Sequence, residues 1–302
     1  MFSPRKLFSK PLNAALAALL LAVAAPVWAD NQAQIEQAVA AYDAGKYEQA
    51  FRLFQPIARQ GNAQAQYNLG VMYEQGKGMA QNNKQALAWY QKAANQGHIK
   101  AQNNLGVMYS QGKGVVPNNQ QAFVWYQKAA NQGFAGAQYN LAMMYKDGLG
   151  VARNYQQAFA WFQKAANQGF ALAQNNLGMM YNNGLGVPQN YQLAKVWFEK
   201  AANQGDVKAQ YNLGSMYENG QGVAQNYQQA AKWYQKAATQ GYAMAQNNLG
   251  AIYANGQGVA KNYQQAKAWW QKVLAQPDTA DNAEAKALAR ENLQKLRTMG
   301  IR

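Results

Sequence analysis

Cysteine is absent from this chain of 302 residues, and histidine occurs only once. Without cysteine the protein can form no disulfide, no thiolate metal site, no cysteine nucleophile and no lipid attachment through an N-terminal cysteine. A single histidine leaves almost no room for histidine-based catalysis or for a multi-histidine metal site. We therefore expect no catalytic residue, no metal and no cofactor, and a binding protein in place of an enzyme.

Long apolar runs are also scarce, and the one at residues 12–25 lies next to the N-terminus. Arg5, Lys6 and Lys10 precede it, and a small-x-small sequence ends at Ala29. This order is typical of a secretory signal peptide, and a membrane span would need about 20 apolar residues. The sequence predicts a signal peptide over 1–29, cleavage after Ala29 and no later transmembrane segment. The protein is then expected in the periplasm of a Gram-negative bacterium or outside the cell.

Charged residues make up only 14% of the chain, against roughly 25% in ordinary soluble domains, so Gln and Asn must supply much of the polar surface. After residue 29 the chain keeps 25 basic and 13 acidic residues, a formal charge of +12. A basic balance indicates nucleic acid, anionic lipid or simple solubility. Because an exported protein rarely meets nucleic acid, we do not expect that partner.

The middle of the chain repeats one unit six times with a period of 36 residues. Each copy begins Ala-Gln-(Tyr/Asn)-Asn-Leu, and Tyr73 and Trp89 recur in every copy. The copies begin at Ala65, Ala101, Ala137, Ala173, Ala209 and Ala245. A fixed period in this range indicates a repeat architecture, with atypical units at both ends. We predict a shortened repeat over 30–64, six repeats over 65–280 and a capping helix over 281–302.

Each repeat is predicted to contain two helices. Apolar side chains at Ala65, Leu69, Met72 and Tyr73 follow the helical period, and the same spacing occurs around Trp89. A Gly-x-Gly pair would end the first helix, and an Asn with Gln three residues later would begin the second. The fourth copy replaces that Gln by Leu193. The fold class is all-α, and the tryptophan column is expected in the core between repeats.

The repeat closely resembles the Sel-one-like repeat, a branch of the tetratricopeptide-repeat superfamily. The matching motifs over 65–276 are A-x-x-N-L-G-x-M-Y, the G-x-G loop, A-x-x-W-Y/F-x-K-A-A and a closing glycine. The resemblance implies a right-handed α-solenoid that serves as a protein-interaction scaffold. Bacterial members of that family are often exported, and they include envelope-signalling regulators, host-contact factors and an immunoglobulin-binding protein. A cysteine-rich branch has been linked to β-lactams, but this chain lacks its cysteines.

Three functions are weighed on these grounds. The first is a monomeric scaffold that binds a protein partner in the envelope or outside the cell. The second is a binder of envelope polyanions through a lysine column late in the second helices, for which a solvated helix face is the plainer interpretation. The third is a weak hydrolase of β-lactam or cell-wall substrates. The column comprises Lys92, Lys128, Lys164, Lys200, Lys236 and Lys272.

The binding face is expected on the first helices, which generally line the concave surface of a solenoid. On a helical wheel, positions 67, 71 and 74 point away from the face of Leu69 and Met72. Exposed Tyr and adaptable Met suit an interface. The alternation of Tyr and Asn at position 67 also fits a duplicated two-repeat block. The predicted contact residues are Tyr67, Val71, Glu74, Asn103, Tyr139, Met143, Lys146, Asn175, Met179, Tyr211, Glu218 and Asn247.

Overall fold

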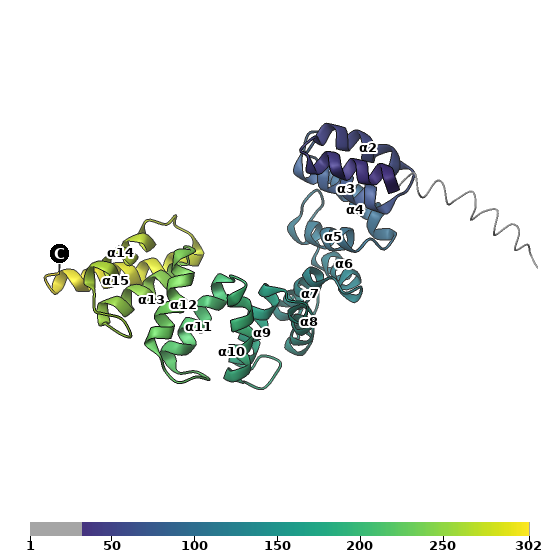
Figure 1. Ribbon diagram of the computed structural model, residues 1–302. Helices are drawn as coiled ribbons and strands as arrows, with labels where there is room; N and C mark the ends of the chain where they lie inside the picture. The colour runs from purple at the N-terminus through teal and green to yellow at the C-terminus, as the bar shows by residue number, and fades with distance from the viewer. Residues whose placement is uncertain (1–31, 302) are drawn as a thin grey trace, which may run out of the picture. The chain divides into compact units, whose positions relative to one another are not determined.

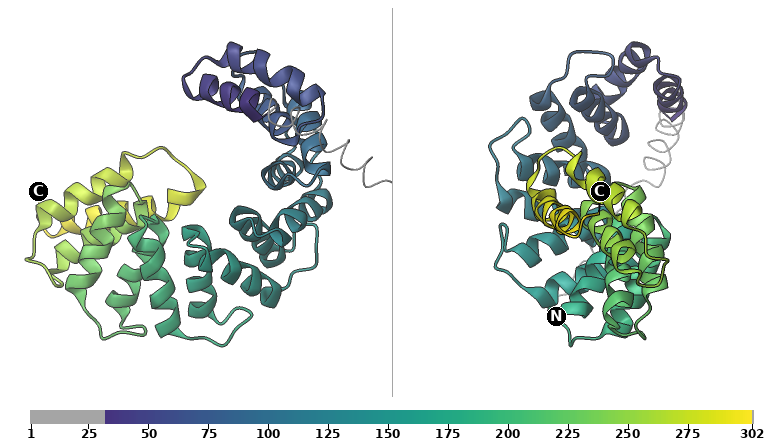
Figure 2. Two further views of the ribbon diagram at one scale, coloured as in Figure 1. Left: turned by 45° about the vertical axis from the view of Figure 1, so that its right-hand side comes forward. Right: turned by 90° about the vertical axis from the view of Figure 1, so that its left-hand side faces the viewer.

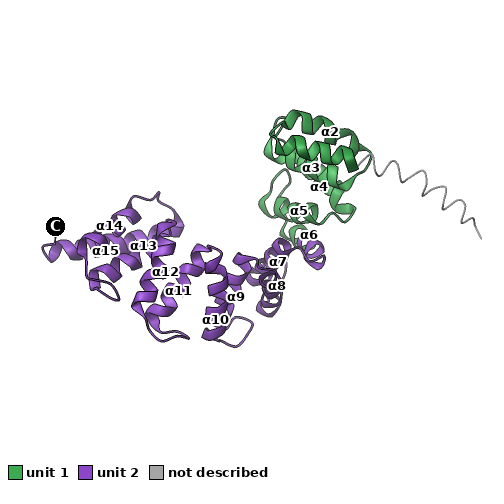
Figure 3. Cartoon of the chain, in the orientation of Figure 1, with its two compact units in different colours: residues 1–125 green, residues 126–302 purple. Residues whose placement is uncertain are grey.

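The computed structural model describes residues 32–301, so the predicted signal peptide lies outside the described residues. Secondary structure over 32–301 is helical, and no strand occurs in that range. The chain divides into two compact units whose boundary falls inside one helix, between Trp125 and Tyr126 (Figure 3). We call them the N-terminal unit and the C-terminal unit and describe each by itself.

The N-terminal unit begins with a helix over 32–43 of the described residues. It continues with α2 (Tyr47–Arg59), α3 (Ala63–Gln75), α4 (Asn83–Asn95), α5 (Ile99–Gln111) and the first half of α6 (Asn119–Asn131). α2 packs against α3, α3 against α4 and α4 against α5 (Figure 1). This sequential packing is the arrangement of a solenoid built from helix pairs.

The C-terminal unit repeats the same plan. Its helices after α6 are α7 (Ala135–Asp147), α8 (Tyr155–Asn167), α9 (Ala171–Asn183), α10 (Tyr191–Asn203), α11 (Val207–Asn219), α12 (Tyr227–Thr239), α13 (Ala243–Asn255), α14 (Tyr263–Leu274), the 3-10 turn η1 (Ala280–Asn282) and α15 (Ala283–Thr298). Consecutive helices pack in order from α7 to α15, and α15 also covers α13 (Figure 2). The all-α solenoid expected from the repeat is confirmed.

Helix ends follow the repeated glycine and asparagine residues. α3 ends at Gln75, and Gly76 takes the left-handed conformation with φ 67°. α4 begins after Asn82, whose side chain accepts a 3.1 Å hydrogen bond from the Gln85 backbone N–H. In the fourth copy Asn190 caps α10 in the same way, at 2.9 Å from the Leu193 N–H. The cap survives that change because it uses only the backbone of the third residue.

The second glycine of each Gly-x-Gly loop has a different role from the first. Gly184 and Gly186 both have positive φ, of 65° and 71°. A Cβ atom on Gly184 would lie 3.4 Å from the Gln189 Cβ, an ordinary contact. A Cβ on Gly186 would lie 2.4 Å from the Tyr155 backbone carbonyl at the start of α8. The second glycine therefore lets this loop lie directly against α8, the second helix of the preceding repeat.

The core of each repeat forms around a buried aromatic residue of the second helix. These residues are Tyr90, Tyr126, Phe162, Phe198, Tyr234 and Trp270. Facing glycines on the first helix allow the close approach, since a Cβ on Gly214 would lie 2.5 Å from the Tyr234 ring. The tryptophan column lies in the clusters that join consecutive repeats, as expected, but its depth varies: Trp125, Trp233 and Trp269 are buried, whereas Trp161 and Trp197 are half-buried. A lysine three residues later covers the indole, as Lys236 does for Trp233 at 4.1 Å from the ring centroid.

A column of buried glutamines joins consecutive repeats and was not anticipated from the sequence. Gln210 donates a 3.2 Å hydrogen bond to the carbonyl of Ala202 near the end of α10. Its own carbonyl accepts a 2.8 Å hydrogen bond from Gln240, which also donates to the Gly205 carbonyl at 3.3 Å. The buried members are Gln66, Gln102, Gln138, Gln174, Gln210 and Gln246. They donate to carbonyls in the last turn of the preceding helix, which also accept a backbone bond, as Ala202 does from the Gly205 N–H at 3.0 Å.

The capping helix α15 differs from its expected form in one residue. Ala285, Ala289 and Leu296 are buried, as an apolar stripe requires. A charged side chain on a terminal helix is expected in solvent, but Lys286 is only 4% exposed. Its ammonium lies 2.6 Å from the Asp278 carboxylate and donates to the backbone carbonyl of Gln276. A buried cation with these partners ties the segment after α14 to the cap.

Candidate functional site

The tyrosines predicted to line an exposed row are half-buried packing residues. The Tyr67 ring stacks on His98 with 4.6 Å between ring centroids and lies 5.9 Å from the Tyr90 ring. Tyr139 and Tyr211 occupy equivalent places, each between two aromatic rings: Phe162 and Phe170 for Tyr139, and Tyr234 and Tyr242 for Tyr211. The expected exposure of this column is wrong. A first helix packs against its own second helix and against the second helix of the preceding repeat, so burial spans more than one stripe.

The asparagines at the same position are also enclosed. Asn175 and Asn247 are 3% and 5% exposed, and Asn103 is half-buried. Asn212 donates a 3.0 Å hydrogen bond to the Asn175 side-chain carbonyl. The Trp270 indole N–H donates to the backbone carbonyl of Asn247 at 3.1 Å. This column therefore stabilises the array and leaves little side-chain surface for a partner.

Carboxylates at position 74 are tied to the core in two repeats. Glu74 accepts a 2.7 Å hydrogen bond from the buried Tyr90 hydroxyl, and Glu218 accepts one of 2.6 Å from Tyr234. Burial, followed by the neighbouring carboxylate, raises the pKa of both tyrosines, so each phenol stays protonated and donating. In the third repeat the position holds Lys146, whose ammonium lies 3.5 Å from Asp147. These pairs orient side chains and neutralise charge locally.

The third predicted column contains an exposed apolar surface. Met179 on α9 is 42% exposed, whereas Val71 and Met143 are half-buried. Leu172, seven residues earlier on the same helix, is 47% exposed and was not among the predicted contacts. Residues seven apart lie on the same side of a helix. A signal for Leu172 was present, because its column reads Gln64, Lys100, Gly136, Leu172, Lys208 and Met244.

A small pocket of about 180 Å³ opens beside Met179. Its apolar lining comes from Met179, Phe198 and Met216, and its polar lining includes Asn182, Asn212 and Ser215. For scale, an apolar cavity of about 150 Å³ can hold benzene. The pocket lies where α9, α10 and α11 meet, inside the C-terminal unit. We call Leu172, Met179 and this pocket the apolar patch of the first-helix face.

The first-helix face around this patch is electrically neutral. α9 and α13 contain no charged residue, and α7 and α11 together contain two lysines and two acidic residues. Those four residues are Lys146, Asp147, Lys208 and Glu218. A neutral surface with apolar and amide side chains suits an uncharged ligand segment.

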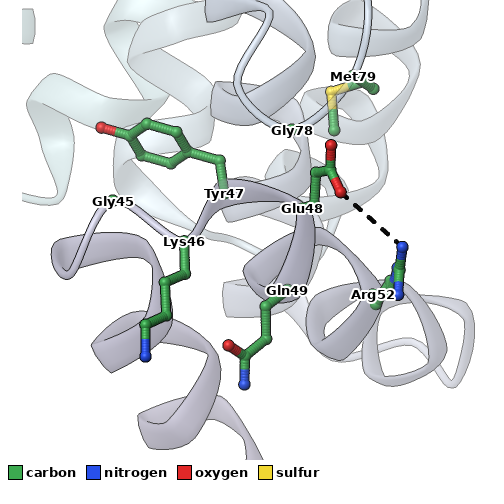
Figure 4. Close-up of a pocket in the computed structure, with 8 residues that line it drawn as sticks. All are labelled: Gly45, Lys46, Tyr47, Glu48, Gln49, Arg52, Gly78 and Met79. Carbon is green, nitrogen blue, oxygen red and sulfur yellow. Dashed lines mark ion pairs between the residues drawn. The ribbon is translucent and has the colours of Figure 1, made fainter.

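A larger depression in the N-terminal unit has no comparable character. Its volume is about 780 Å³, and Figure 4 shows its lining. Glu48 and Arg52 face each other at 3.9 Å, while the side chains of Lys46 and Gln49 point away from that pair (Figure 4). Both partners of the ion pair are about four-fifths exposed, at 80% and 82%. Exposed pairs of this kind contribute little energy, so this depression is a shallow meeting point of a loop with α2.

Residues 32–301 were searched for groups of metal ligands and for membrane-spanning helices. Nowhere in that range do three His, Asp or Glu side chains gather as metal ligands would. No helix of the described part is long and apolar enough to cross a bilayer.

Fold and surface together define an all-α solenoid repeat protein with a neutral, partly apolar first-helix face. The family model for the Sel1 repeat matches residues 41–62, 63–98, 99–134, 135–170, 171–206, 207–242 and 243–276. The chain therefore belongs to the Sel1 repeat family, as the resemblance predicted. Sel1 repeat proteins are generally protein-interaction scaffolds, and their fold is typically non-catalytic.

Two solved structures are similar to this chain over most of its length. One is a protective antigen present in uropathogenic Escherichia coli strains, which displays the same repeat fold at 36% identity and a TM-score of 0.75. The match covers 86% of this chain but only 57% of that protein. The other is a Sel1 repeat protein from Oxalobacter formigenes, at 34% identity and a TM-score of 0.74, covering 82% of this chain and 98% of that one. A comparison with curated proteins found no match.

Proposed function

We propose that this protein is a scaffold that binds a protein partner through the apolar patch of its first-helix face. The observation that supports this function most is the exposure of Leu172 and Met179 on one side of an uncharged helix, next to a pocket of about 180 Å³. The pocket has room for one large apolar side chain, and the amides around it can hydrogen bond a peptide backbone. The partner segment is therefore uncharged and carries one bulky apolar residue.

A displayed random-peptide library selected against the chain without residues 1–29 tests this proposal. The test variant is Leu172→Gln with Met179→Gln. The matched control is Leu193→Gln with Val196→Gln on α10, since these residues are similarly exposed on the opposite helix of the repeat. Selected peptides should be uncharged with one large apolar residue, and should bind the test variant about tenfold more weakly or worse. They should bind the control as well as the wild type. Equal binding to both variants would refute the site.

We also propose that the protein acts in the periplasm or outside the cell after cleavage at Ala29. The basic residues and apolar run at the N-terminus support export, as does similarity to a protein described as a protective antigen. Mass spectrometry of the native protein should give a chain that begins at Asp30. An intact N-terminus on cytoplasmic protein would overturn this proposal while leaving the apolar patch untouched.

A further inference from the structure

Charge is segregated between the two helices of each repeat in the C-terminal unit. The second helices α8, α10, α12 and α14 contain seven lysines and one glutamate, Glu199. The lysines are Lys164, Lys195, Lys200, Lys232, Lys236, Lys267 and Lys272. The first helices of the same unit are neutral, as described above. A formal charge of +6 therefore lies on the second-helix face alone.

Most of these positive charges are not balanced by an acidic residue on the same four helices. Glu199 pairs with Lys195 at 2.9 Å, and it is the one acidic residue on these four helices. On α12, Lys232 and Lys236 lie one turn apart and both are exposed. Like charges at that spacing destabilise a helix. The equivalent helix α8 forms with Lys164 alone, so the extra charge is not required by the fold.

Four of the lysines are held in a regular row by tryptophan rings. Each ammonium lies over the indole three residues earlier, at 3.8 Å for Lys164, 4.1 Å for Lys200 and Lys236, and 4.2 Å for Lys272. All four lysines are exposed. The ring restricts the side chain but leaves its charge, so less side-chain entropy is lost when an anion binds. We call these four residues the lysine row.

The chemistry of the face favours carboxylates presented by a polypeptide. Arginine, whose planar fork suits phosphate, does not occur on the four helices. Exposed or half-buried amides flank the row, such as Gln163 and Asn167 beside Lys164, and amides can hydrogen bond peptide groups. Exposed large apolar side chains on these helices are confined to Leu193 and Val196. That is too little apolar surface for insertion into a bilayer.

We propose that the second-helix face of the C-terminal unit binds an acidic polypeptide segment, whose carboxylates pair with the lysine row. This surface is distinct from the apolar patch, which lies on the neutral first helices. The scaffold would then carry two faces of different selectivity, one for an uncharged segment and one for an acidic segment.

The test measures binding of a fluorescent poly-L-glutamate peptide to the chain without residues 1–29. The test variant replaces the row by glutamine: Lys164→Gln, Lys200→Gln, Lys236→Gln and Lys272→Gln. The control removes the same charge from exposed positions outside the four helices: Arg153→Gln, Lys208→Gln, Lys261→Gln and Arg297→Gln. We expect the test variant to bind about tenfold more weakly or worse, because four exposed ion pairs are lost together. The control should stay near wild type, and added salt should weaken wild-type binding.

Several results would overturn the proposal. Equal losses in the two variants would mean that net charge alone attracts the peptide. Unchanged binding in the test variant would exclude the row. Equally tight binding of polygalacturonate or single-stranded DNA would mean a face for polyanions in general, and binding to phosphatidylglycerol vesicles would mean a membrane surface. Circular dichroism of both variants confirms folding, and wild-type tryptophan fluorescence should change on binding as the ammonium groups leave the rings.

Discussion

The two glycines of one Gly-x-Gly loop should differ sharply in their sensitivity to alanine. Both have positive φ, which costs an L-residue about 1–2 kcal/mol. Gly184→Ala should cost only that amount, because its new methyl meets an ordinary contact at 3.4 Å. Gly186→Ala also places a methyl 2.4 Å from the Tyr155 carbonyl. Because that neighbour is helix backbone, the loop must shift, and overpacking adds about 1–3 kcal/mol.

Chemical denaturation followed by far-ultraviolet circular dichroism compares the two variants. Repeat arrays need not unfold in a single step, so amide hydrogen exchange of α8 to α10 should be measured alongside. Gly169→Ala is the control, since Gly169 has φ 86° and nothing within 4 Å of its Cβ position. It should behave like Gly184→Ala. Equal losses for all three substitutions would show that backbone conformation, and not the contact between loop and helix, governs this position.

Single contacts of His98, Gln210 and Trp161 contribute to the stability of the array. His98 Nδ1 accepts a 3.2 Å hydrogen bond from the Ala101 N–H, and burial lowers the pKa of the ring. The unfolded state therefore binds more protons than the folded state, so the free energy of unfolding should fall as the pH drops from 7 through the folded pKa of His98. His98→Asn keeps a neutral cap and should remove this pH dependence in thermal melts. Gln210→Leu should cost about 1–3 kcal/mol by removing two buried hydrogen bonds, measured by denaturation. Trp161→Ala should cost less than Tyr234→Ala in the same assay, because Trp161 is half-buried whereas Tyr234 is buried.

A helical wheel predicted the exposure of only some residues of the candidate site. The wheel found Met179, because an apolar residue opposite Leu69-type positions must face outward unless something covers it. It misplaced Tyr67, which Tyr90 of the second helix and His98 at the start of α5 cover. It also missed Leu172, because the apolar residues of that column, Leu172 and Met244, stand out only when the copies are compared position by position and not on the wheel of one helix. A wheel describes one helix axis, and exposure depends on how many neighbours that helix has.

The sequence by itself determined the period, the helix pairs and their ends. Gly76 and Asn82 act through local backbone geometry, so their spacing is sufficient to predict where α3 ends and α4 begins. Only the tertiary structure decided which polar side chains are buried. Gln210 and Lys286 are enclosed because residues 30 and eight positions away supply their hydrogen-bond partners. Contacts of that kind form only when separate segments of the chain pack together, and burial of a polar group is tolerated only once those partners are in place.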